Sequence, residues 1–156
     1  MSIWKLPPTI KIYEALGCLA DQRIHIDDNT AKVYSSSGNK FYTVTFAPEI
    51  KAIMCNDNGS YWQGYLGYPA IAFLLKRGII PYSNTNAELL KNIMWKDINQ
   101  GFNNDFAKTK KYCQDLVVER GGDLSTFLAE VERIHQHLED QPLSVLGKKI
   151  KPPSGY

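Results

Sequence analysis

The sequence predicts an α+β fold: an N-terminal helix, a small antiparallel β-meander of about four strands, a buried helix and a C-terminal helical bundle. Three observations support this prediction. Apolar residues recur at helical spacing near the N-terminus, alternate with polar residues between positions 23 and 55, and return to helical spacing beyond position 85. Clusters of Gly, Asn, Asp and Ser separate the alternating segments, as expected for tight turns.

The first helix is predicted over residues 10–20. Its apolar residues share one face, while Lys11 and Glu14 are expected elsewhere on the surface. Gly17 weakens the prediction, because glycine inside a helix costs about 1 kcal/mol relative to alanine.

Four strands are predicted from the alternation of side chains, over residues 23–26, 30–35, 40–46 and 50–55. Ile24 and Ile26 are expected on one face of the first strand, and Tyr42, Val44 and Phe46 on one face of the third. Connections this short between successive strands indicate an antiparallel meander.

A buried helix is predicted over residues 69–77, because the run that follows Pro69 is apolar on every side. Proline suits the entrance of a helix, where its missing N–H costs little. Gly78 offers a left-handed position that ends the helix.

The remaining chain predicts helices. Thr85 and Glu88 form a capping-box pattern before a helix reaching about residue 99, and the spacing continues from there to residue 120. A last amphipathic helix is predicted over residues 124–138, with Asp123 as its cap. Its apolar stripe suits either the intramolecular core or a homodimer seam.

The predicted organisation has three parts: an αββββα unit over residues 1–80, a helical part over residues 81–141 that shares the same core, and a lysine- and proline-containing tail over residues 142–156. We expect the tail to be mobile unless another part of the chain holds it.

The composition limits the classes of function. The chain has 156 residues, and its formal charge of +2 argues against a dedicated non-specific nucleic-acid binder, although a local basic patch stays open. The three cysteines lie far apart without a C-x-x-C pattern, which favours buried thiols in a cytoplasmic protein. No apolar run is long enough to span a bilayer, so no membrane association is predicted.

No pattern of catalytic or metal-binding residues stands out, so neither a catalytic residue, a metal nor a cofactor is predicted. The alternative that stays open is an enzyme of unrecognised type in which Cys55 acts with His25 or Asp57. A thiolate at Cys55 would need a cationic or His partner that lowers its pKa.

The most unusual stretch is an aromatic, glycine-rich loop after the fourth strand. Aromatic rings with interspersed glycines offer stacking surfaces and close backbone approach. The same rings could instead seal the sheet against the helices. The predicted binding residues are Lys40, Tyr61, Trp62, Tyr65 and Tyr68.

Residues 31–75 resemble a SWIM zinc finger that lacks its zinc ligands. The segment VYSSSGNKFYTVTF resembles the strand that precedes the ligands, and IMCND with YLGYPAIAFLL resembles the ligand-bearing part. The ligand positions then fall on Ile53, Cys55, Leu66 and Tyr68, of which only Cys55 could bind metal. The resemblance implies a zinc-free ββα module, held by apolar packing, that contacts DNA or protein.

These observations favour a small cytoplasmic binding or adaptor protein that contacts a protein or nucleic-acid partner through the aromatic loop. The alternatives are the Cys55 enzyme and a structural homo-oligomer joined through residues 124–138.

Overall fold

A computed structural model describes residues 1–154 of the chain. The main helices are α1 (Ile10–Ala20), α2 (Tyr68–Lys76), α3 (Asn84–Glu88), α4 (Trp95–Gly101), α5 (Phe106–Glu119) and α6 (Leu124–Asp140). The strands are β1 (Ile24–Asp27), β2 (Thr30–Tyr34), β3 (Phe41–Ala47), β4 (Ala52–Cys55) and β5 (Ser144–Val145). Two short helical turns, η1 (Pro48–Ile50) and η2 (Gly59–Gln63), flank β4. The α+β prediction is confirmed.

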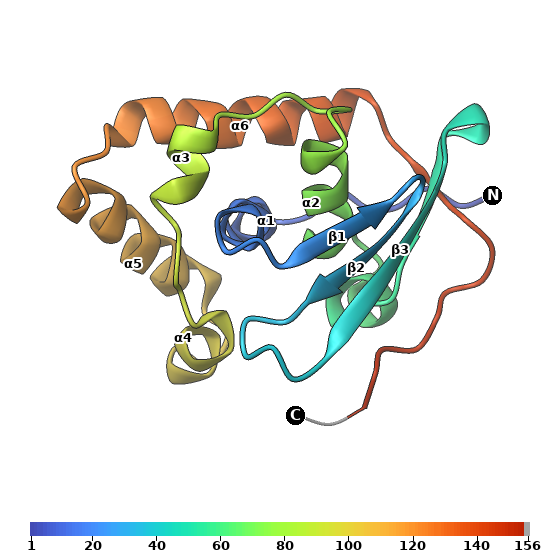
Figure 1. The fold of residues 1–156 in the computed structure, drawn as a ribbon, viewed down its shortest axis with the longest axis horizontal. Helices are drawn as coiled ribbons and strands as arrows, with labels where there is room; N and C mark the ends of the chain where they lie inside the picture. Colours follow the sequence, from blue (N-terminus) through green and yellow to red (C-terminus); the bar gives the residue numbers. More distant parts are fainter. Residues whose placement is uncertain (155–156) are drawn as a thin grey trace.

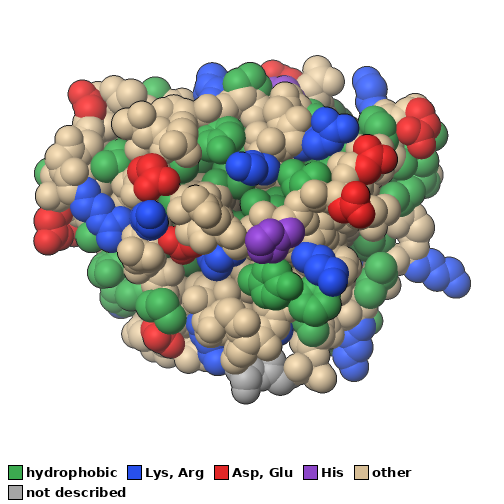
Figure 2. Space-filling view, in the orientation of Figure 1, with side chains coloured by type: hydrophobic (Ala, Val, Ile, Leu, Met, Phe, Trp, Pro, Cys, Tyr) green, Lys and Arg blue, Asp and Glu red, His purple; other side chains and the backbone are tan. Residues whose placement is uncertain are grey.

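The sheet has the order β1-β2-β3-β4-β5, and its first four strands form the predicted antiparallel meander. The register places Ile24 opposite Val33 and Val33 opposite Tyr42, all on the buried face. His25, Lys32 and Thr43 follow one another on the opposite, exposed face. The alternation read from the sequence therefore assigns the two faces correctly. On the side of the molecule drawn in Figure 2, basic and acidic side chains are interspersed.

The fifth strand comes from the segment that the sequence analysis assigned to a mobile tail. β5 pairs in parallel with β4, with Ala52 opposite Ser144 and Ile53 opposite Val145. Ile3, near the N-terminus, makes an isolated bridge to Ser144. After β5 the chain runs down beside the sheet (Figure 1). Residues 155 and 156 of the predicted tail lie outside the described residues.

Helix α1 lies at the centre of the molecule, between α2 and the helices of the C-terminal part (Figure 1). The prediction that Lys11 and Glu14 lie on the surface is wrong, since Glu14 is only 4% exposed and Lys11 is half-buried. A helix packed on several sides leaves little polar surface for its charged residues. Packing explains the glycine at position 17, because the indole of Trp95 lies where a larger side chain would have to fit.

We expect Gly17→Ala to destabilise the protein in spite of the better helix propensity of alanine. A Cβ at this position would lie 2.9 Å from Trp95 Nε1. The overpacking cost of about 1–3 kcal/mol exceeds the helix gain of about 1 kcal/mol, so a net loss of about 1 kcal/mol follows. Urea unfolding measures this loss. A variant more stable than the wild type would show that the indole moves aside freely.

The C-terminal helices have side-chain caps that differ in part from the prediction. Asp123 caps α6 as predicted, through Thr126 N, but Ser83 rather than Thr85 caps α3, by accepting a hydrogen bond from Asn86 N. The helix predicted as continuous to residue 99 is broken between α3 and α4. Buried Glu130 of α6 accepts hydrogen bonds from Ser83 N (2.7 Å) and from Asn86 Nδ2 (2.6 Å), so α6 holds α3 in place.

The apolar stripe of α6 is buried inside the chain. Its members join the same buried cluster as residues of α1, α2 and the sheet: Phe127, Val131, Ile134 and Leu138. The stripe of α6 therefore packs in the intramolecular core, which is one of the two roles predicted for it. A homodimer through residues 124–138 would have to use the outer face of α6.

Candidate functional site

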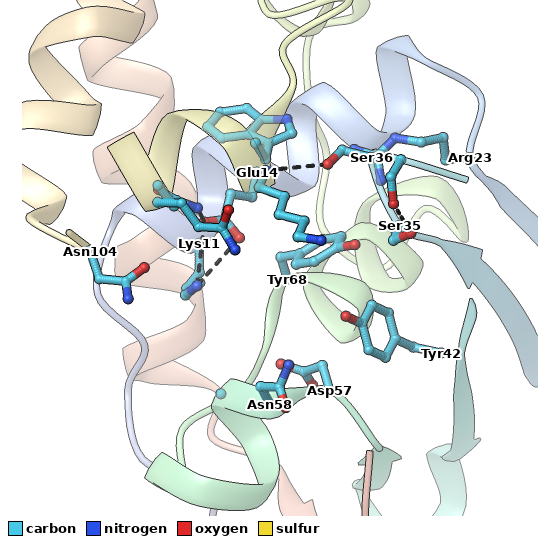
Figure 3. A pocket seen from close by; sticks show the side chains of 16 residues that line it. Lys11, Glu14, Arg23, Ser35, Ser36, Tyr42, Asp57, Asn58, Tyr68 and Asn104 are labelled. Carbon is cyan, nitrogen blue, oxygen red and sulfur yellow. Dashed lines mark hydrogen bonds and ion pairs between the residues drawn. The ribbon is translucent and has the colours of Figure 1, made fainter. Parts of the chain in front are cut away.

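A polar cavity of about 340 Å³ lies between α1, the β2–β3 turn, the segment that precedes α2, and α4 (Figure 3). Every lining residue except Gly59 carries a polar side-chain atom. We call it the central pocket; its lining comprises Lys11, Glu14, Arg23, Ser35, Ser36, Ser37, Tyr42, Asp57, Asn58, Gly59, Tyr68, Trp95, Lys96, Asn99, Gln100 and Asn104. These residues come from five separate stretches of the sequence.

One wall of the pocket is an ion pair that α1 supplies. Lys11 Nζ lies 3.3 Å from Glu14 Oε1, and Asn99 Nδ2 donates to the same oxygen at 3.5 Å. Thr109 in turn donates to Asn99 Oδ1 at 3.1 Å, which fixes the amide from α5. Burial lowers the pKa of Lys11, but the charge of Glu14, its hydrogen bond, and the charges of Tyr65 and Asp57 together outweigh burial and leave that pKa raised. The ammonium is therefore fully protonated at neutral pH.

Arg23 forms the wall next to the sheet. Its Nη1 donates to Tyr34 O at 2.6 Å, and its Nε lies 3.4 Å from Asp21 Oδ2. Its Nη2 is buried without a hydrogen-bond partner; among residues 1–154 only Trp95 Nε1 shares this condition. Trp95 Nε1 packs against Gly17 of α1, so Arg23 Nη2 is the unpartnered donor that the pocket has to explain, because buried polar atoms nearly always find a partner.

Asp57 forms the floor of the pocket and holds the loop that leads to α2. Its carboxylate accepts hydrogen bonds from Cys55 Sγ (2.9 Å), Ser60 N (3.3 Å) and the Ser60 hydroxyl. The same hydroxyl accepts from Gly67 N at 3.1 Å. Asp57 is only 5% exposed, so this network replaces the water that a buried carboxylate needs. Its role here is structural.

Two tyrosines complete the pocket on the sheet side, and Lys40 lies next to one of them. The rings of Tyr42 and Tyr68 meet edge to face, 6.2 Å apart, and the Arg23 guanidinium lies 6.0 Å from the Tyr68 ring. Lys40 Nζ lies 5.3 Å from the Tyr42 ring, just outside the lining. Burial raises the pKa of Tyr68 well above its ordinary value, so its hydroxyl stays protonated.

The predicted binding residues divide into two groups. Tyr68 lines the pocket and Lys40 lies beside it. Tyr61 and Trp62 lie on the helical turn η2, with ring centroids 4.6 Å apart, and Trp62 is 63% exposed. Tyr65 is half-buried beneath this turn, where a Cβ at Gly59 would overlap its ring. The structure therefore does not bring all five together in one site.

The residues of the alternative enzyme are only partly brought together. Cys55 contacts Asp57, but His25 lies on the exposed face of β1, three strands away from β4. Burial raises the pKa of the Cys55 thiol well above its ordinary value, and the charge of Asp57 raises it further. Burial also raises the pKa of Cys18 and of Cys113 to about 12. All three thiols are buried and free, as predicted from their spacing.

The four positions of the SWIM resemblance have different environments. Ile53 and Leu66 join the apolar core, Cys55 bonds to Asp57, and Tyr68 lines the central pocket. In the described part of the chain, no group of three or more His, Cys, Asp or Glu side chains is placed to hold a metal ion. Within residues 1–154, no helix combines the length and apolar character that crossing a bilayer requires.

Of the residues that line the central pocket, the sequence singles out Tyr68 as a binding residue and Asp57 as a partner of Cys55 in the alternative enzyme. The sequence predicts only a turn for the serines of the pocket, and only a surface position for Lys11 and Glu14. One sequence pattern could have indicated the pocket. Lys11 and Glu14 lie one turn apart on a helix with few other polar residues, as expected for charged side chains that face a buried polar site.

Over residues 4–144 the sequence matches the family model described as Uncharacterised conserved protein UCP014422. No curated protein and no solved structure matches the chain. The matched residues include the whole lining of the central pocket.

Proposed function

The chain belongs to the family described as Uncharacterised conserved protein UCP014422, and this description names no activity. We propose a function from the central pocket instead. The proposed function is that of a binding protein that holds a small polar molecule in this pocket. The observation that supports it is the lining, in which charged and hydrogen-bonding side chains from five stretches of the chain surround one cavity.

The rigidity of the walls supports this proposal. Glu14, Arg23 and Asp57 are each held by other parts of the chain, through Asn99, Tyr34 and Ser60 respectively. A site whose polar groups are already fixed loses little conformational entropy when a ligand binds. The volume falls within the range of about 300–1,000 Å³ that small-molecule sites occupy, and the almost wholly polar lining suits a polar rather than an apolar ligand.

A blocking substitution tests the proposal. Gln100 is exposed on α4 and lines the pocket, whereas Asp97 is exposed on the same helix and does not. We expect polar metabolites in a library to shift the amide resonances of lining residues in the ¹⁵N-labelled chain. Gln100→Trp should abolish these shifts, while Asp97→Trp should leave them. The proposal fails if no compound perturbs the lining, or if Gln100→Trp leaves the shifts unchanged.

A second candidate function is the contact of a nucleic-acid or protein partner through Tyr61 and Trp62. The observation that favours it is the exposure of Trp62 on η2, together with two lysines at Gly64, where η2 ends. A Cβ at Gly64 would lie 3.3 Å from Lys149 Nζ and 3.8 Å from Lys5 Cε. Exposed rings beside cations are typical of single-strand binding surfaces.

Fluorescence quenching by a single-stranded oligonucleotide separates this candidate from the first. We expect quenching that Trp62→Ala removes and that Gln100→Glu, a substitution in the central pocket that adds no fluorophore, leaves unchanged. Quenching that persists unchanged in Trp62→Ala would place the contact elsewhere.

A further inference from the structure

The charged side chains of the central pocket differ in how far the protein itself satisfies them. The two lining carboxylates are already engaged: Asp57 by Cys55 and Ser60, and Glu14 by Lys11 and Asn99. On the donor side, Arg23 Nη2 has no acceptor in the described part of the chain. Trp95 Nε1 has none either, but it packs against Gly17 of α1, which is not part of the lining. A ligand that supplies acceptors therefore complements this lining, and one that supplies only donors does not.

The charges of the lining point in the same direction. It holds three cationic side chains, Lys11, Arg23 and Lys96, against two carboxylates. A third carboxylate, Asp21, pairs with Arg23 from behind the pocket and is also bound by Asn92 N at 2.8 Å. The carboxylates are thus neutralised within the scaffold, while the ammonium and guanidinium groups border the cavity.

The remaining neighbours are hydroxyl groups suited to an oxyanion. Ser35, Ser36 and Ser37 form the edge of the pocket next to Arg23, and Ser36 Oγ accepts from Lys96 N at 3.4 Å, which ties the serine turn to α4 (Figure 3). Tyr68 keeps its hydroxyl proton and can donate it. Guanidinium, ammonium and hydroxyl donors that converge on one cavity are the groups that bind phosphate and carboxylate.

We propose that the ligand of the central pocket is a small organic anion whose phosphate or carboxylate group lies between Arg23, Lys96 and the serine turn of residues 35–37. This proposal rests on the proposed function and adds the chemical class of the ligand. The anionic group would supply the acceptors that the lining lacks.

The three tryptophans of the chain supply a direct test by NMR. Inorganic phosphate and, separately, acetate are titrated into the ¹⁵N-labelled full chain at constant ionic strength, with chloride as the reference anion. We expect saturable shifts of the Trp95 indole N–H and of Arg23 Nε–H, and none of the Trp62 indole, which lies outside the lining. Saturation by phosphate but not acetate, or the reverse, identifies which group the ligand carries. Shifts equal to those with chloride mean an adventitious ion only and overturn the proposal.

A pair of charge-matched variants localises the effect. Lys96→Gln should weaken binding about tenfold, the loss expected for one charge-assisted contact. Lys32→Gln removes the same charge from the exposed face of the sheet and should leave the affinity unchanged. Equal weakening by both variants would mean a general electrostatic effect and overturn the proposal. Thermal unfolding of each variant confirms that it is folded.

The two proposals fail in distinguishable ways. If neutral polar compounds shift the lining in a manner that Gln100→Trp abolishes, but neither anion binds, the anionic ligand is wrong and the binding function stands. If neither anions nor neutral compounds perturb the lining, both proposals fail.

Discussion

Replacing Gly67 by alanine is expected to cost about 2–6 kcal/mol, a large part of the stability of a domain of this size. The backbone at Gly67 is extended and would accept any residue, so conformation is not the reason. The reason is space, because a Cβ there would overlap three atoms of the Asp57 carboxyl group. The estimate combines about 1–3 kcal/mol of overpacking with about 1–3 kcal/mol for the hydrogen bonds that a displaced Asp57 loses.

A double-mutant cycle shows whether Asp57 is the cause. In an Asp57→Ala background the added methyl group meets no carboxylate, so Gly67→Ala should cost far less there than in the wild type. Gly101→Ala is the matched control, because nothing lies within 4 Å of its Cβ position at the end of α4. The control should change the unfolding free energy by less than about 1 kcal/mol. Similar losses for Gly67→Ala in both backgrounds would refute the steric explanation.

Truncation of Phe127 to alanine is expected to cost about 3–5 kcal/mol. The side chain is 0% exposed, and its ring meets Tyr13 of α1 edge to face at 5.2 Å. Because Val131, Ile134 and Leu138 still join α6 to the common core, we expect urea unfolding to remain a single transition with a lower midpoint. Far-UV circular dichroism and tryptophan fluorescence should therefore report the same midpoint.

Val118→Ala is the control for the Phe127 substitution. Val118 lies on α5 and is exposed, so its truncation should stay within about 0.5 kcal/mol of the wild type. Two separate transitions in Phe127→Ala would instead show that residues 81–141 unfold independently of the sheet. That outcome would contradict the single core that the buried cluster indicates.

The parts of the fold that the sequence predicts well are those with a simple period and a clear boundary. Alternation assigns Val33 and Val44 to the buried face, and Gly78 ends α2 in the left-handed conformation as expected. The break between α3 and α4 was missed because apolar spacing continues through it. Burial of Leu90 and Ile93 in the core preserves that spacing without helical hydrogen bonding throughout.

The central pocket could not be predicted, because no local pattern encodes it. The pocket brings together Arg23, Ser36 and Lys96 only when α4 packs against α1. That packing depends on Gly17, because a side chain there would collide with Trp95. Helix propensity predicts only that Gly17 weakens α1, whereas in the structure Gly17 is the position where Trp95 of α4 packs against α1. Aromatic composition drew attention to Trp62, which lies outside the pocket.

The parallel pairing of β5 has a consequence for synthesis of the chain. Until residues 144 and 145 have left the ribosome, β4 presents unsatisfied N–H and C=O groups beside finished strands. Such an open edge can recruit another nascent chain. A stop codon introduced just before Ser144 should accordingly yield inclusion bodies, whereas one placed after Leu146 should leave the edge covered.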